Sequence, residues 1–99
     1  FGFDLIFSRQ LEAVGNKEDF LVVITTSGKS QNIIEAVKKA NEMNIKVLAL
    51  AGSDTSSLEE GSSYIISIPS EVTGVIQQAH ITIGQIFCKI LELNMINRK

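Results

Sequence analysis

Residues 20–32 read Phe-Leu-Val-Val-Ile-Thr-Thr-Ser-Gly-Lys-Ser-Gln-Asn, and this stretch decides the fold. The run from Phe20 to Thr25 has the length of one strand and shows no alternation of apolar and polar residues. Such a run is typical of a strand buried on both faces of a parallel sheet. A polar turn follows, and an amphipathic helical pattern begins at Ile33. We therefore expect a strand, a turn and a helix in direct succession.

The turn between this strand and helix, residues 25–30, is called the hydroxyl turn below. Its hydroxyl side chains and its glycine are Thr25, Thr26, Ser27, Gly28 and Ser30. A helix N-terminus offers free N–H groups and about half a positive charge, so it favours anions. We predict that this turn holds the phosphate of a phosphosugar. Most hydroxyl-rich turns after strands bind nothing, and that alternative stays open.

The turn is distinct from two better-known phosphate loops. Val23 stands where a Walker A loop requires its first glycine, and the three spaced glycines of a dinucleotide fingerprint are missing. Lys29 is a candidate phosphate contact, although a solvated loop lysine is the simpler interpretation.

Composition limits the class of protein. The 99 residues suffice for one small domain, with 44% hydrophobic residues, 20% charged residues and a net charge of -2. This charge provides no basic surface for nucleic acid. No apolar run is long enough to span a membrane and no signal peptide is visible, so we expect a cytoplasmic protein. Cys88 stands alone in an apolar pattern, which predicts a buried, inert thiol.

The remaining pattern alternates helices and strands. We expect a helix capped by Asp4 and ended by Gly15, and a stop of the second helix at Asn44. The other expected elements are strands at 46–50 and 64–68, a short helix at 55–60 and a long helix at 71–94. This order predicts an α/β three-layer unit with a parallel sheet of three strands, whose ligands bind at the carboxyl ends of the strands.

The long helix carries an apolar seam with steps of three and four. Its members are Val72, Ile76, Ala79, Ile83, Ile86, Ile90 and Leu93. Val75, Phe87 and Leu91 lie outside the seam, so the helix is apolar on more than one side and needs more than one partner surface. We expect a homo-oligomer formed through the 71–94 helix. Packing on the chain's own sheet alone is the alternative.

Few side chains are candidates for acid–base or metal chemistry. His80 is the only histidine, and packing is its simpler role. With one histidine and one cysteine, a metal site made by this chain alone is improbable. Gln77 shares a helical stripe with His80 and Gly84. Gly84 fits either close approach of a ligand or tight helix packing.

Several segments together resemble the sugar isomerase (SIS) domain family, in the phosphoheptose isomerase branch. Residues 25–32 resemble the family's Ser-Thr-Ser-Gly-x-Ser-x-Asn signature, and residues 7–15 resemble Phe-Ser-Arg-x-Val-Glu-Ala-Leu-Gly. Residues 46–52 are similar to the family's strand and glycine, and residues 76–80 to its Ile-Gln-Glu-x-His motif. The resemblance covers nearly the whole chain in order, and it implies that residues 1–99 are the C-terminal part of a single SIS domain.

The resemblance implies a flavodoxin-like sandwich that binds a phosphorylated sugar through Thr25, Thr26, Ser27, Gly28 and Ser30. Gln77 matches a glutamine that contacts substrate and, in some members, zinc. The enzymes, sedoheptulose 7-phosphate isomerases, interconvert a ketose and an aldose phosphate and form homotetramers. Their base is a glutamate with no counterpart here, so we expect the isolated chain to be inactive.

Two departures from the family favour a second interpretation. Gln85 stands where the isomerases carry a histidine that is acid and zinc ligand, and an amide exchanges no proton near neutral pH. Gly74 and Val75 replace an Asp-Arg pair. This pattern resembles the non-catalytic relatives, such as the DnaA initiator-associating protein, which keep the fold for binding.

Overall fold

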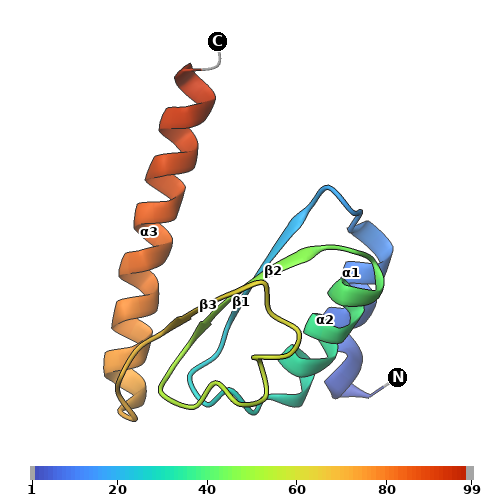
Figure 1. Cartoon of the computed structure of the whole chain (residues 1–99), viewed down its shortest axis with the longest axis horizontal. Coiled ribbons are helices and arrows are strands. Elements are labelled where there is room, and N and C mark those ends of the chain that lie inside the picture. Colours follow the sequence, from blue (N-terminus) through green and yellow to red (C-terminus); the bar gives the residue numbers. More distant parts are fainter. Residues whose placement is uncertain (1, 98–99) are drawn as a thin grey trace.

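The structure is a computed structural model, and it describes residues 2–97. Figure 1 shows a small α/β body from which one long helix extends. The helices are a 3-10 turn at Phe3–Leu5, α1 at Ile6–Val14, α2 at Gln31–Glu42 and α3 at Thr73–Asn97. The strands are β1 at Phe20–Ile24, β2 at Lys46–Ala51 and β3 at Tyr64–Ser67.

The strands form one parallel sheet in the order β1-β2-β3. Phe20 pairs with Lys46 and Ile24 with Leu50, while Leu48 pairs with Tyr64. The expected three-stranded parallel sheet is therefore confirmed. Because the strands run in one direction, the hydroxyl turn after β1 and the loop after β2 emerge at the same edge.

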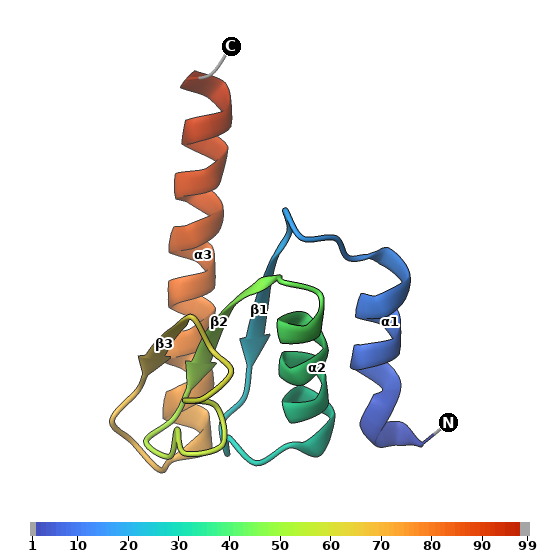
Figure 2. The same ribbon diagram turned by 45° about the vertical axis from the view of Figure 1, so that its right-hand side comes forward.

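One face of the sheet is covered by α1 and α2. The two helices pack on one another, and α2 packs on β1 and β2 (Figure 2). The buried apolar cluster between them comprises Val23, Val37, Ala40, Ile45, Val47, Ala49, Ala51 and Leu58. Side chains of successive strand residues alternate between faces, so the odd-numbered strand residues supply this core.

The other face is covered only in part. Helix α3 packs on the central strand β2, where Leu50 is 1% exposed. The edge strand is left open: Phe20, Val22 and Ile24 are about half exposed, at 50%, 48% and 55%. The expectation that 20–25 is buried on both faces was therefore wrong for one face. The helix crosses the middle of the sheet and does not close over its β1 edge.

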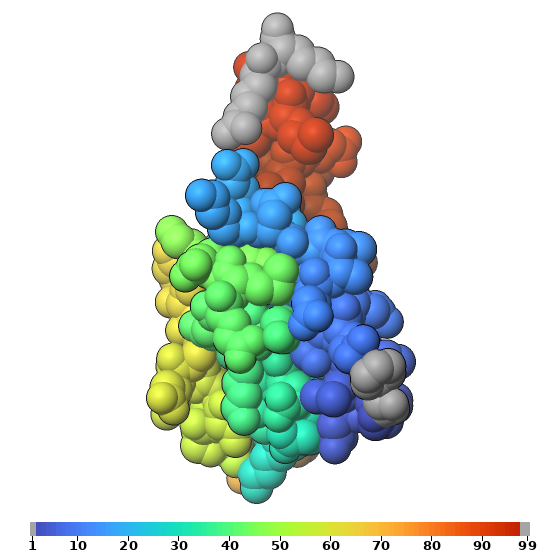
Figure 3. Space-filling view, turned by 90° about the vertical axis from the view of Figure 1, so that its right-hand side faces the viewer, coloured from blue at the N-terminus to red at the C-terminus, as the bar shows by residue number. Residues whose placement is uncertain are grey.

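Helix α3 is much longer than the strands it crosses. At 1.5 Å per residue its 25 residues extend about 37 Å, whereas a strand of this sheet extends about 17 Å. Its C-terminal part projects beyond the body (Figures 1 and 3). Cys88 on α3 is exposed, so the prediction of a buried thiol was wrong. The thiol lines an open hollow between α3 and the sheet, together with Phe20 and Tyr64, and no side chain of residues 2–97 fills this hollow.

Most local signals agree with the observed ends of the elements. Gly15 ends α1 and donates its N–H to Leu11 O at 2.8 Å, and Asn44 has φ 60° after α2. The predicted cap at Asp4 was wrong, because Asp4 lies inside the 3-10 turn and caps no helix. The predicted short helix at 55–60 is a series of turns. Six residues before Gly61 are too few to extend a helix beyond its first, costly turn.

The three-layer α/β/α arrangement around a parallel sheet is thus the observed architecture, with α1 and α2 on one face and α3 on the other. Among residues 2–97, no helix has the length and hydropathy needed to cross a membrane.

Candidate functional site

The hydroxyl turn is braced by its own side chains. Thr25 is buried, and its backbone N–H continues the ladder to Leu50 O at 2.9 Å. Its Oγ1 accepts the N–H of Gly28 at 3.1 Å. Ser27 Oγ accepts the N–H of Lys29 at 3.1 Å. Both hydroxyls act as acceptors in these bonds, so each keeps its own proton to donate to an anion.

Gly28 occupies a position that only glycine fits. Its φ of +69° lies in the left-handed region, which other residues rarely adopt. Its Cα also lies directly against the backbone carbonyl of Asp54, leaving no room for a Cβ. The turn after β1 and the loop after β2 therefore touch at this point, and the glycine permits the contact.

Ser30 is the N-cap residue of α2. Its carbonyl oxygen accepts the N–H groups of Ile33 and Ile34 at 3.1 and 3.0 Å. Its hydroxyl makes no capping hydrogen bond, although serine at this position usually does so. The free hydroxyl stands beside the first N–H groups of the helix, which have no intrahelical partner. This group of donors at the positive end of α2 suits a phosphate oxygen.

The charges beside the turn nearly cancel. Lys29 Nζ lies 3.6 Å from Asp54 Oδ2, and both side chains are exposed. Hydrogen bonds from the hydroxyl and then the N–H of Ser56 hold the pKa of Asp54 below its ordinary value, and Lys29 adds to this effect. Asp54 is therefore ionised near neutral pH. Lys29 is the one cationic side chain within the hydroxyl turn itself.

The structure brings five of the six predicted substrate-binding residues together in this one turn: Thr25, Thr26, Ser27, Gly28 and Ser30. The sixth, Gln77, lies on the second turn of α3, and its side chain is exposed. No hydrogen bond among the described residues joins Gln77 to the turn. Its place in a shared site stays a prediction.

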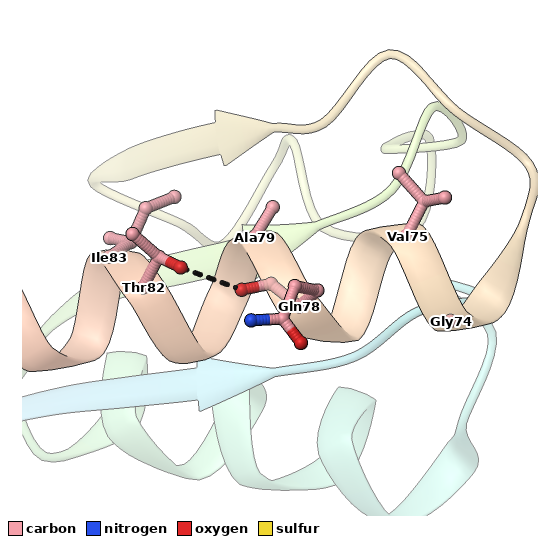
Figure 4. A pocket seen from close by; sticks show the side chains of 6 residues that line it. All are labelled: Gly74, Val75, Gln78, Ala79, Thr82 and Ile83. Atoms are coloured by element: carbon pink, nitrogen blue, oxygen red, sulfur yellow. Dashed lines mark hydrogen bonds between the residues drawn. The ribbon is translucent and has the colours of Figure 1, made fainter.

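A hollow of about 560 Å³ runs along α3, close to Gln77 in sequence. Figure 4 shows the residues that line it, Gly74, Val75, Gln78, Ala79, Thr82 and Ile83, all from that helix. Its only marked hydrogen bond is local, from Thr82 Oγ1 to Gln78 O at 3.0 Å. The hollow includes no residue of the hydroxyl turn, and its lining is mostly apolar. It carries no part of the predicted site.

The described residues do not fit a zinc site. Residues 2–97 contain no group of three or more His, Cys, Asp or Glu side chains placed to hold a metal ion. Gln77 and Gln85 carry amides, which are poor zinc ligands. His80 Nε2 is already bonded to Ala51 O at 3.0 Å. We therefore derive no role for zinc from this chain's own residues.

The sequence places the loop of residues 52–55 at the same carboxyl edge as the hydroxyl turn, but it does not predict the contacts that Gly52 and Asp54 make with that turn. A Cβ built on Gly52 would stand 2.7 Å from Thr26 O, so Gly52 is packed against the turn. The signal that identifies them is topological: parallel neighbouring strands end at one edge, so the residues following β2 must lie beside those following β1.

The comparison with known proteins agrees with this architecture. The SIS domain model matches residues 6–92, so the chain belongs to the SIS domain family. Within the family, the chain is similar to phosphoheptose isomerases. It is 42% identical over 92 residues to phosphoheptose isomerase 1 of Campylobacter jejuni, covering 93% of this chain and 50% of that protein.

Other relatives give the same result. The chain is 45% identical to the phosphoheptose isomerase of Leptospira biflexa, covering 93% of this chain and 47% of that protein. Solved phosphoheptose isomerases from Neisseria gonorrhoeae and Francisella tularensis superpose with TM-scores of 0.85 and 0.87 at 39% and 38% identity. These superpositions cover 90% and 92% of this chain but 51% of each solved chain. The chain thus spans about half the length of the relatives that it matches.

Proposed function

We propose that the hydroxyl turn binds the phosphate group of a phosphorylated sugar. The observation that carries the proposal is that hydroxyl protons without a hydrogen-bond acceptor gather at the N-terminus of α2. The hydroxyl of Ser30 makes no cap bond, that of Ser27 is engaged only as an acceptor, and both stand at the start of α2. A phosphate monoester is the anion whose several oxygens use such a set. That the phosphate belongs to a sugar is inferred from the relatives, which are phosphoheptose isomerases.

We propose further that the chain is the C-terminal part of a single SIS domain. A longer protein that contains this part would catalyse the ketose–aldose isomerisation of sedoheptulose 7-phosphate. That reaction moves a proton between adjacent carbons, and it needs a base. The residues that we place here bind and orient: the turn takes the phosphate, and Gln77 contacts the sugar. The base is a residue outside this chain.

A second candidate function is binding without turnover, as in a non-catalytic SIS-fold scaffold. His80 favours it, because the only histidine of the chain is buried and bonded to a backbone carbonyl. Gln85, exposed on α3, offers only an amide. Neither side chain is suited to exchange a proton with substrate. Turnover of sedoheptulose 7-phosphate by the longer protein separates the two functions, since the scaffold predicts binding and no product.

The oligomer forms through α3 in this proposal. Exposed apolar side chains gather on the C-terminal half of α3, including Ile86, Ile90 and Leu93, which belong to the predicted seam. A partner helix would remove them from water. We place the protein in the cytoplasm, because the exposed thiol of Cys88 fits a reducing compartment.

The phosphate proposal is tested by replacing both free hydroxyls. Ser27→Ala/Ser30→Ala should weaken inorganic phosphate binding by about tenfold or more, since hydrogen bonds to a charged group are the strong ones. The urea midpoint should change little, because the Ser30 hydroxyl caps nothing and the bond that Ser27 accepts from the Lys29 N–H is exposed to water. Affinity is measured by titration of amide signals in the 99-residue chain.

The matched control is Ser53→Ala/Ser57→Ala, which removes two exposed hydroxyls from the loop after β2. This control should bind phosphate as the unchanged chain does. Equal affinity in both double variants would reject the hydroxyl turn as the phosphate site.

A further inference from the structure

His80 occupies an unusual place for a polar residue. It lies on α3 and is 3% exposed, so it is one of only two residues that the described helix buries, together with Ile76. Its Nε2 lies 3.0 Å from Ala51 O. A carbonyl oxygen can only accept, so the proton must be on Nε2. In the neutral ring this leaves Nδ1 as a buried acceptor, and Nδ1 has no partner among residues 2–97.

An unpartnered buried acceptor destabilises a fold. An apolar residue of similar size would fill the same space without this penalty. The bond from Nε2 to Ala51 O provides what an apolar residue would not, a fixed distance between α3 and the end of β2.

The carbonyl that receives this bond ends the sheet. Ala51 O also accepts the N–H of Ile68 at 3.0 Å, beyond the last paired residues of β2 and β3. The next residue, Gly52, is held on three sides. A Cβ built on it would stand 2.8 Å from Ile76 Cδ1 and 2.7 Å from Thr26 O, and its own carbonyl accepts the hydroxyl of Ser67 at 2.7 Å.

These contacts connect α3 to the hydroxyl turn in two steps. His80 and Ile76, one helical turn apart, hold the Ala51–Gly52 peptide, and Gly52 lies against the Thr26 carbonyl. We propose that His80 is a positioning residue: through its Nε2–H bond to Ala51 it sets the backbone against which Thr26 and the hydroxyl turn are placed. This inference rests on the proposed phosphate site for its functional consequence, but the positioning is observable without it.

The test compares two replacements in the 99-residue chain. In His80→Gln the side-chain amide carries N–H groups about as far from the backbone as Nε2 of histidine. In contrast, His80→Leu keeps an apolar side chain in the same space and has no donor. His80→Leu should shift the amide signals of Gly52 and Thr26 and weaken inorganic phosphate binding by about fivefold or more. His80→Gln should leave the amide signals of Gly52 and Thr26 close to their positions in the unchanged chain. Its affinity for inorganic phosphate should lie within about twofold of that of the unchanged chain. The matched control is Thr82→Ala, which removes a bond local to α3.

A two-bond proton–nitrogen spectrum of the unchanged chain reports the tautomer directly and should show the proton on Nε2. A proton on Nδ1 would overturn the proposal even if His80→Leu failed to fold. It would also be overturned if His80→Leu lowered only the urea midpoint, or if His80→Gln behaved like His80→Leu. Absence of phosphate binding by the unchanged chain would reject the phosphate site, while the amide shifts of Gly52 and Thr26 would still decide the positioning role.

Discussion

The Cα of Gly28 lies directly against the backbone carbonyl of Asp54, and this contact joins the two loops at the carboxyl edge of the sheet. Gly28 belongs to the hydroxyl turn, and Asp54 follows β2. The contact is possible because glycine has no Cβ and because its φ of +69° is available to it without strain. The conformation of the turn thus depends on Gly28, because glycine has no side chain.

Gly28→Ala should therefore disrupt the turn. The left-handed conformation and the contact with Asp54 both oppose a Cβ, and we expect a loss of about 2 kcal/mol or more of unfolding free energy. Phosphate binding should be lost as well, because the donors of the turn are displaced. Urea denaturation and phosphate titration measure the two effects. An alanine variant with unchanged stability and binding would contradict the role given to this contact.

Gly84→Ala should have the opposite effect on stability. Gly84 lies inside α3, and a Cβ built on it meets no atom within 4 Å. Alanine lowers the conformational freedom of the unfolded chain, so we expect a gain of about 0.5–1 kcal/mol. Thermal unfolding followed by circular dichroism measures it. A loss of stability would instead indicate a close partner at this position, such as a neighbouring helix in an oligomer.

The pair Lys39 and Glu12 should make stability depend on pH. Lys39 Nζ lies 3.0 Å from Glu12 Oε2 on α1 and 2.9 Å from Glu42 Oε2 on its own helix. The hydrogen bond from Lys39 holds the pKa of Glu12 below its ordinary value of 4.5, with the charge of Lys39 adding to it. A lowered pKa in the fold means that the contribution is present above pH 4.5 and is lost as the pH falls through the lowered value.

Lys39→Met should remove this dependence. The difference in urea midpoint between the unchanged chain and the variant should be largest near pH 7 and should shrink toward pH 3. The matched control is Lys38→Met, because Lys38 pairs with Glu35 on the same helix at 3.7 Å and joins no second element. A pH profile that is parallel for Lys39→Met and the unchanged chain would refute the assignment.

The projecting part of α3 should drive self-association. Ile90 and Leu93 are 49% and 48% exposed, and lysine at both positions would oppose their burial against a partner helix. We expect the unchanged chain to sediment as an oligomer and Ile90→Lys/Leu93→Lys to sediment as a monomer. Glu92→Lys, an exposed polar site on the same segment, is the control for added charge. A monomeric unchanged chain would contradict the proposed assembly.

Much of the fold was predictable because its signals are local. The apolar run of β1, Gly15 after α1 and the left-handed Asn44 after α2 each mark an element through the chemistry of a few neighbouring residues. The hydroxyl turn was predictable for the same reason. A strand that stops in hydroxyls before a helix puts those hydroxyls at the N-terminus of the helix.

Apart from the cap at Asp4 and the short helix at 55–60, the errors concern contacts between residues that are far apart in the sequence. An unbroken apolar run predicts burial of Phe20, Val22 and Ile24, but their exposure depends on where α3 crosses the sheet. Cys88 lies in an apolar helical pattern and is exposed for the same reason. The contact of Gly28 with Asp54 joins residues 26 positions apart, and the helical period of α3 alone gives no sign that His80 reaches Ala51.

The central claim, a phosphosugar bound at the hydroxyl turn, is tested most directly by mapping sedoheptulose 7-phosphate onto the amide signals of the chain. The account predicts saturable shifts at residues 25–32, at Gly52 and Asp54 beside them, and at Gln77 on α3. Shifts on α3 without any in the hydroxyl turn, or none at all at millimolar ligand, would contradict it.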